Sequence, residues 1–262
     1  MKTRSCAVCG MFYPRDSAHL TQILEGFFSR TAPGEPALGI VSPHAGYIYS
    51  GQIAAYAFSR IDPGFSGTFV VIGPSHHGYL TSASAIPWET PLGLVEIDAE
   101  FIDALDIPVD EPSHEEEHSI EVQLPFIRHR FPRARVVPIM MGEQDPAHAA
   151  AVAEKIVAAQ RLTKKEIRVV ASSDFSHYVP EAQAKTGDLY AIEPLARLDI
   201  KEFYRRIREK RVTACGYGPI SAMVAVCQCM GAGRGELIRY ATSGDVTNDR
   251  NQVVGYAAIA VM

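Results

Sequence analysis

The sequence has no long hydrophobic run and no excess of positive charge. Across 262 residues, no apolar stretch is long enough to span a membrane, and Met1–Cys6 leads into no hydrophobic signal segment. Lysine and arginine together number 25 against 30 aspartates and glutamates, which gives a net charge of -5. Binding to the phosphates of nucleic acid requires a basic surface. We therefore expect a cytoplasmic protein whose main partner is neither a membrane nor a nucleic acid.

Several common nucleotide-binding and hydrolase motifs are also missing. There is no G-x-x-x-x-G-K-[ST] phosphate loop and no G-x-G-x-x-G after a strand. The G-x-S-x-G turn of serine hydrolases is absent as well. The sequence thus gives no support to a nucleotide-binding protein or a serine hydrolase.

Cysteine is scarce, with five residues in the chain. Cys6 and Cys9 form a single C-x-x-C, whereas a structural zinc site usually needs a second ligand pair that this sequence lacks. In the cytoplasm we expect all of these cysteines to be reduced. Cys215, Cys227 and Cys229 are interpreted as ordinary small apolar residues, and a redox role for Cys6 and Cys9 is the alternative.

What the sequence does contain is a regular alternation of short apolar runs and amphipathic stretches. Strands are predicted over 38–41, 68–72, 136–141, 167–171, 237–242 and 253–261, and helices over 18–30, 51–61, 147–159, 199–209 and 220–230. This order predicts one domain over 1–262, a three-layer α/β/α sandwich with a largely parallel central sheet. The last two strands can add to it as an antiparallel pair. The acidic, proline-containing stretch 106–121 is predicted to be a long loop.

Histidines follow three of the predicted buried strands. His44 follows the strand at 38–41, His76 the strand at 68–72, and His177 the strand at 167–171 together with Asp174. In an open parallel sheet, ligands bind beyond the carboxyl ends of the strands. Neutral imidazole is a good ligand for Fe(II), Zn(II) and Cu(II), and a histidine off the metal can move protons near neutral pH. We therefore predict one histidine-lined metal pocket at this edge.

Two further groups are candidates for the same pocket. His118 and Glu121 lie in an acidic stretch, where the alternative is a solvated loop leading into a helix. Asp245 follows the predicted strand at 237–242, where the alternative is a simple turn between two strands. With His44 and His76, the Asp245 carboxylate would complete the two-histidine, one-carboxylate set that holds non-haem Fe(II) with open positions.

These segments together resemble the Memo family. The resemblance rests on motifs that occur in the family's order: Pro43-His44-Ala45-Gly46-Tyr47, Gly73-Pro74-Ser75-His76-His77, Glu117-His118-Ser119-Ile120-Glu121, Ser172-Ser173-Asp174-Phe175-Ser176-His177 and Gly255-Tyr256-Ala257-Ala258. They cover nearly the whole chain from Met11 onward. The bacterial and archaeal branch is known as AmmeMemoRadiSam system protein B, alongside a radical-SAM protein, which makes such a protein the expected partner.

The resemblance implies a fold similar to that of class III extradiol dioxygenases, which are non-haem iron enzymes. It places His44 and His76 as metal ligands and His177 as the acid/base residue, beside Asp174. Animal members carry a cysteine as a third metal-site residue, and our alignment puts that position at Val246. Asp245, one residue earlier, is the nearest replacement and is predicted to be the third ligand.

Two classes of function follow from the sequence. The first is a dioxygenase-like oxidoreductase in which Fe(II), with Cu or Zn as alternatives, binds His44, His76 and Asp245, while His177 moves a proton and is oriented by Asp174 or His118. Its substrate is an unidentified small molecule or peptide. The second is an adaptor that binds a peptide or partner in a vestigial pocket, as animal members of the family are regarded as signalling adaptors. A zinc-dependent hydrolase is a variant of the first class.

Overall fold

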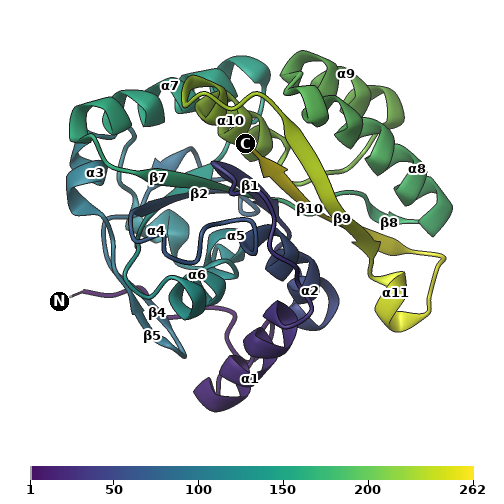
Figure 1. Cartoon of the computed structure of the whole chain (residues 1–262), viewed down its shortest axis with the longest axis horizontal. Helices are drawn as coiled ribbons and strands as arrows, with labels where there is room; N and C mark the ends of the chain where they lie inside the picture. The colour runs from purple at the N-terminus through teal and green to yellow at the C-terminus, as the bar shows by residue number, and fades with distance from the viewer. Residues whose placement is uncertain (1) are drawn as a thin grey trace.

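The computed structural model describes residues 2–262, and its centre is an eight-stranded sheet in the order β3-β6-β2-β7-β1-β10-β8, with β9 pairing with β10 (Figure 1). The strands are β1 (Gly39–Ser42), β2 (Thr68–Pro74), β3 (Ser82–Ala83), β6 (Arg135–Met141), β7 (Ile167–Ser172), β8 (His177–Val179), β9 (Gly235–Thr242) and β10 (Val253–Val261). A separate hairpin consists of β4 (Trp88–Thr90) and β5 (Gly93–Val95).

The middle of the sheet is parallel. β6, β2, β7 and β1 are neighbours that run in one direction, with Val71 of β2 opposite Val170 of β7. Every residue of β1 and β2 is buried, as expected for strands covered on both faces. β10 runs antiparallel to β1, β8 and β9, and β3 runs antiparallel to β6. The carboxyl ends of β1, β2 and β7 therefore meet at one edge.

Helices cover both faces of this sheet (Figure 1). The face at the bottom of the figure carries α1 (Ser17–Phe28), α2 (Tyr47–Phe58) and α6 (Leu124–Arg130), and the opposite face carries α7 (Pro146–Thr163), α8 (Glu181–Ile192), α9 (Ile200–Lys210) and α10 (Tyr217–Cys229). The shorter helices are α3 (Ala99–Ala104), α4 (Glu111–His114), α5 (His118–Glu121) and α11 (Gly244–Thr247), with a 3-10 helix at Glu193–Arg197. Over residues 2–262, no helix combines the length and apolar character needed to cross a membrane.

The predicted three-layer α/β/α sandwich with a largely parallel sheet is confirmed, and so is the antiparallel pairing of the last two strands. The long loop predicted over 106–121 is wrong, because this stretch contains α4 and α5. α5 begins where the side chain of Glu117 accepts a hydrogen bond from the backbone N–H of Ser119. One carboxylate among several in an acidic run therefore acts as a helix cap.

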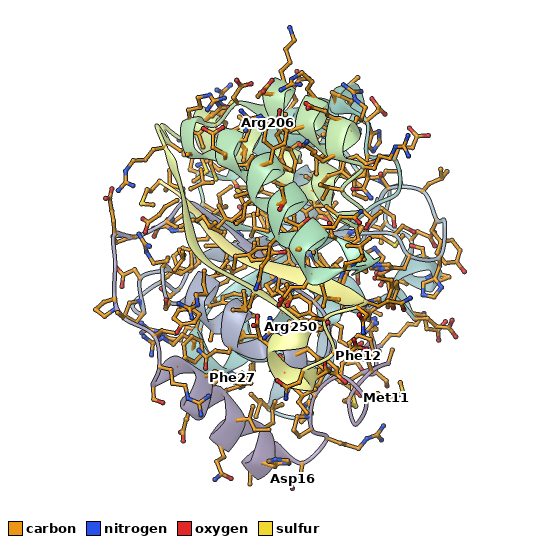
Figure 2. All side chains as sticks on the ribbon, turned by 90° about the vertical axis from the view of Figure 1, so that its right-hand side faces the viewer. Met11, Phe12, Asp16, Phe27, Arg206 and Arg250 are labelled. Atoms are coloured by element: carbon orange, nitrogen blue, oxygen red, sulfur yellow. A yellow bond between two sulfur atoms is a disulfide. The ribbon has the colours of Figure 1, made fainter. Side chains whose placement is uncertain are left out.

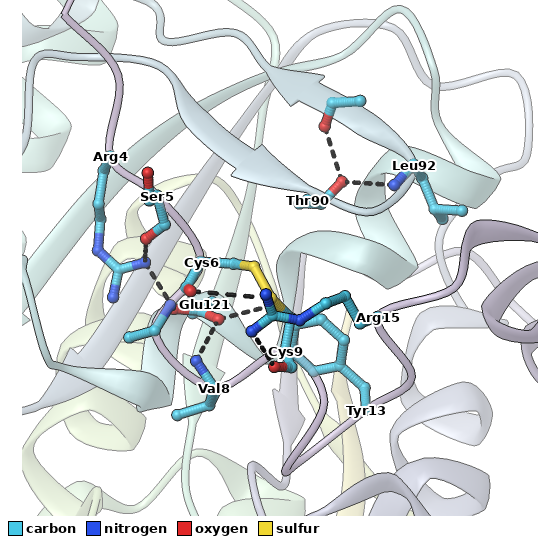
Figure 3. Close-up of a disulfide and its surroundings, with 12 residues drawn as sticks. Arg4, Ser5, Cys6, Val8, Cys9, Tyr13, Arg15, Thr90, Leu92 and Glu121 are labelled. Carbon is cyan, nitrogen blue, oxygen red and sulfur yellow. Dashed lines mark hydrogen bonds and ion pairs between the residues drawn. A yellow bond between two sulfur atoms is a disulfide. The ribbon is translucent and has the colours of Figure 1, made fainter.

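The N-terminal segment contradicts the expectation that every cysteine is reduced. Cys6 and Cys9 form a disulfide, while Cys215, Cys227 and Cys229 are free (Figure 3). The disulfide closes a short loop on the segment that leads to Met11 and Phe12. The isolated C-x-x-C is therefore a cross-link in this structure rather than half of a zinc site.

Glu121 fixes this loop to the body of the protein (Figure 3). Its carboxylate, which is fully buried, accepts hydrogen bonds from Arg4, the Tyr13 hydroxyl and the backbone N–H groups of Ala7 and Val8. The guanidinium of Arg4 also lies over the ring of Trp88, 3.9 Å from the ring centroid. Glu121, which the sequence made a candidate for the pocket, is thus the anchor of the N-terminal segment.

Replacing Glu121 by Gln should lower the free energy of unfolding by about 3 kcal/mol, because it leaves the buried Arg4 guanidinium without a counter-charge. Urea denaturation followed by circular dichroism measures this change. The control is Glu115→Gln, since Glu115 is exposed, and it should shift stability by less than about 0.5 kcal/mol. Equal effects of the two variants would contradict the anchoring role.

Stability should also fall in mild acid because of His114. This side chain is fully buried beside Ser82 and Trp88, and burial is the main reason that its pKa is lowered to about 4. The unfolded chain takes up the proton near pH 6.5, so stability is complete above that pH and declines as pH falls toward 4. The loss amounts to about 3 kcal/mol for this group. Thermal melts of His114→Gln should show a shallower decline than the wild type between pH 7 and pH 4.5.

Candidate metal centre

Three histidines meet at the carboxyl edge of the parallel strands. His44 follows β1, His76 follows β2, and His118 begins α5, which packs against β2. Each offers a ligand atom, and these atoms lie within 4.8 Å of one another; among residues 2–262 no other such group is found. Parallel strands end at one edge of the sheet, and only β7 separates β1 from β2, which is why residues so distant in sequence converge.

The hydrogen bonds around His44 determine which of its ring nitrogens is free. The hydroxyl of Ser172 donates to the backbone oxygen of Ser119, and it accepts from Gln123. It can therefore only accept from His44 Nδ1, which lies 2.9 Å away. His44 Nδ1 therefore carries the proton, and Nε2 keeps the lone pair. Burial lowers the pKa of His44 well below its usual value, and the neighbouring His118 and His76 lower it further.

Glu117 performs the equivalent task for His76. Its buried carboxylate accepts from His76 Nδ1 at 2.9 Å and from the His76 backbone N–H at 2.7 Å. Burial alone raises the pKa of Glu117, but the hydrogen bonds from His76 outweigh it, and the net pKa is well below the usual value. Glu117 is thus an ionised carboxylate that accepts a hydrogen bond from Nδ1–H of His76. Nε2 of His76 therefore remains available as a ligand atom. A carboxylate behind a ligating histidine is the usual arrangement in metal sites.

His118 is held close to the other two rings. Its ring centroid lies 4.4 Å from that of His76 and 5.4 Å from that of His44. Burial, followed by the charge of His76, lowers its pKa to about 4, so the ring is neutral at pH 7. Gly73 allows this approach, because a Cβ there would lie 2.3 Å from the Ser119 hydroxyl. The sequence predicted that His118 orients a catalytic group; in the structure its ring also lies with His44 and His76 in the group that could hold a metal ion.

Asp174 and His177 lie on the side of the cluster formed after β7. Asp174 is 4% exposed and accepts a hydrogen bond from the backbone N–H of His44 at 2.9 Å. Burial raises the pKa of Asp174 to about 6. His177 Nδ1 donates to the backbone oxygen of Thr213, which leaves Nε2 as its free nitrogen. A carboxyl that can hold or release a proton near neutral pH and an imidazole with a free nitrogen thus stand beside the histidine cluster.

Cys215 also touches the cluster. Its Sγ lies 3.1 Å from Nε2 of His44 and accepts from the backbone N–H of Asp174. Burial, and then the charge of Asp174, raises the pKa of the thiol. The next residue, Gly216, permits this packing, because a Cβ there would lie 2.3 Å from the backbone oxygen of Ser172. The sequence offered no local signal for Cys215, since no motif surrounds it.

An open cavity of about 720 Å³ lies over the cluster. His44, His76, His118, Asp174 and His177 all line it, together with aromatic side chains of several other segments. Met11 and Phe12 of the N-terminal segment close one side, and α11 and the loop after it close another; Figure 2 labels Met11 and Phe12 near α11. The ring of Phe12 lies 5.0 Å from that of His118.

The chain as a whole matches the model of a protein family described as "Memo-like protein" over residues 4–260. It belongs to the Memo family. Among its relatives are a "MEMO1 family protein" of Methanococcoides burtonii, 44% identical, and one of Archaeoglobus fulgidus, 41% identical. The alignments cover 98% of this chain and 99% of the first relative, and 96% and 97% for the second. The resemblance inferred from the motifs is therefore confirmed.

Asp245 is separate from this Memo-family cluster. It lies in α11, is exposed, and its carboxylate accepts from the backbone N–H of Thr242. Neither Asp245 nor Val246 is among the ligand group, and Val246 is 45% exposed. In the structure, His118 is the residue that joins His44 and His76, and Cys215 is the cysteine in contact with His44. Asp245 as the third metal ligand stays a prediction.

The donor set fits a divalent transition metal. Three imidazoles converge, and two of them have their Nδ1 occupied by a hydrogen bond to Ser172 or Glu117. Imidazole nitrogen suits Fe, Cu and Zn, so the geometry is compatible with each of the metals that the sequence suggested. The structure thus contains a possible three-histidine metal site.

Glu117→Gln should weaken metal binding about 10-fold to 100-fold, because the amide orients His76 less well and lowers its basicity. Titration of the metal-free protein with Co(II), followed by visible absorbance, measures the affinity. Glu116→Gln is the matched control, since Glu116 is exposed and adjacent, and its affinity should equal that of the wild type. A wild-type affinity in Glu117→Gln would remove Glu117 from the site.

Proposed function

We propose that the protein is a non-haem Fe(II) oxidoreductase, similar to the dioxygenases, whose metal is held by His44, His76 and His118. The observation that carries this proposal is the group of three imidazoles whose ligand atoms lie within 4.8 Å of one another beneath an open cavity. Ferrous iron, when bound, supplies an exchangeable electron and open coordination positions for substrate and oxidant. Zinc or copper in place of iron is the alternative that the donor set also accommodates.

The protein's own residues supply the proton chemistry in this proposal. His177 has a free Nε2 at the cavity wall and acts as the acid/base residue. Asp174 supports it, because a carboxyl with a pKa of about 6 can hold or release a proton near neutral pH. The side chain of His76, which is 31% exposed, leaves the cluster accessible from the cavity. Glu117 and Ser172 keep the two strand-end imidazoles in the tautomer that presents Nε2.

A non-catalytic adaptor is the second candidate, favoured by a separate apolar groove. This groove, with a volume of about 660 Å³, adjoins the cavity through Met11 and Phe12 and is lined by Ile23, Phe27 and Ile48. Such a groove suits an apolar peptide side chain without any need for a metal. The two candidates therefore differ in whether the histidine cluster is occupied in the working protein.

Metal content tests the proposal directly. The protein should be purified without a metal-affinity tag under anaerobic conditions, and analysed by elemental mass spectrometry beside His44→Ala, His118→Ala and Asp245→Ala. We expect about one iron per chain in the wild type and in Asp245→Ala, and loss of iron in both histidine variants. Circular dichroism confirms that each variant is folded.

The other outcomes discriminate between the candidates. Zinc in place of iron would point to hydrolysis, because zinc has no redox chemistry and activates water. Retention of iron in His118→Ala and its loss in Asp245→Ala would restore the ligand set predicted from the sequence. A folded wild type that takes up no metal even when Fe(II) is added would leave the adaptor as the better description.

The location of the protein in the cell and the identity of its partner are separate from its chemistry. We propose that the protein works in the cytoplasm on a small molecule or peptide, with a radical-SAM protein as its partner by family resemblance. Co-purification of a radical-SAM protein with the tag-free protein from its source cells tests the proposed partnership.

A further inference from the structure

The cavity over the histidine cluster has an unusual charge pattern. Within the described residues, its lining contains no lysine and no arginine, although the chain carries 25 such residues. Its non-histidine charged groups are Asp174 beside His44 and Asp249 in the loop after α11. An anionic ligand would therefore find no lysine or arginine to pair with in the cavity wall.

Asp249 is available to a ligand. Its Oδ1 accepts from the backbone N–H and the side chain of Asn251, whereas Oδ2 has no hydrogen bond to any residue between 2 and 262. The adjacent Arg250 does not neutralise it, because its guanidinium pairs with Glu181; Figure 2 labels Arg250 next to α11. One carboxylate oxygen at the cavity rim thus remains free.

Aromatic rings form much of the remaining wall. Phe12, Tyr49, Tyr178 and Tyr256 all line the cavity, each from a different segment of the chain. Tyr178 has a positive φ of 57°, which is rare for a bulky residue, and its side chain is 73% exposed. Holding an aromatic residue in this conformation beside a cavity costs free energy, and such strain gathers at ligand sites.

Aromatic faces and a free carboxylate are together the groups that recognise an organic ammonium ion. The ring faces attract the cation through their quadrupole, and the carboxylate pairs with it. The volume of about 720 Å³ leaves ample room for a ligand with one aromatic ring and a short side chain.

We propose that this cavity binds a small aromatic amine, with the ring between the aromatic walls and the ammonium group at Asp249. The inference deepens the proposed function, and it rests on that function only in naming the substrate class of the same site. In the metal-free protein it predicts weaker binding of carboxylate-bearing and phosphate-bearing aromatic compounds, because the lining has no lysine or arginine to pair with them.

A charge series of ligands tests the proposal on the full chain after treatment with a chelator. Tyramine, 4-ethylphenol and 4-hydroxyphenylacetate share a phenol ring and carry a positive, zero and negative charge in that order. Isothermal titration calorimetry at pH 7 and low salt should rank their affinities in the same order. We expect tyramine to bind at least about 3-fold more tightly than 4-ethylphenol, which is the scale of one exposed ion pair.

Asp249→Asn isolates the contribution of the carboxylate. It should remove most of the preference for tyramine over 4-ethylphenol, since the asparagine still accepts from Asn251 but has no charge. The control is Asp103→Asn, which makes the same change in net charge at an exposed position of α3 outside the cavity lining. That variant should keep the full preference.

Three results would overturn the proposal. The first is that 4-hydroxyphenylacetate binds at least as tightly as tyramine. The second is that Asp249→Asn keeps the preference for tyramine over 4-ethylphenol. The third is that none of the three ligands binds up to millimolar concentration. Because metal is absent from this measurement, it can fail while the metal-content experiment succeeds. The reverse combination, in which amine binding is observed but no metal is taken up, would retain the ligand class and reject the redox function.

Discussion

The candidate site depends on the hydrogen bonds that one buried carboxylate, that of Glu117, accepts. It caps α5 through the N–H of Ser119, and it binds both the backbone and the ring of His76. A single group thus joins the end of β2 to the start of α5. Because His118 is the first residue of that helix, the same carboxylate brings two of the three rings together.

A second buried carboxylate, one helical turn further along, connects the site to the N-terminal segment. Glu121 pairs with Arg4 and accepts from Tyr13 on either side of the Cys6–Cys9 loop. The segment continues to Phe12, whose ring lies beside His118 and lines the cavity. α5 therefore supplies His118 to the histidine cluster with its first residue and fixes the segment of the cavity wall with its last residue, Glu121. A buried charge of this kind is tolerated only because each oxygen is fully hydrogen-bonded.

Asp174 and Cys215 show how the third strand contributes. β7 lies beside β1 in the sheet, so the residues after it reach His44. Asp174 accepts from the backbone of His44, and Cys215 contacts its ring. The burial that raises the pKa values of this carboxyl and this thiol also lowers the pKa of His44.

The sequence by itself determined the layers of the fold, the family, and the edge at which the site forms. Apolar periodicity marks buried strands, and histidines directly after 38–41 and 68–72 are bound to lie at the carboxyl edge of a parallel sheet. Only the tertiary structure decided the rest. In the sequence, Glu117 is one of several glutamates in an acidic run, and Cys215 has no motif around it. The side chain of Asp245 accepts a hydrogen bond from Thr242, three residues earlier in the chain. Ligand identity depends on side-chain directions across strands and helices distant in sequence, which local patterns do not specify.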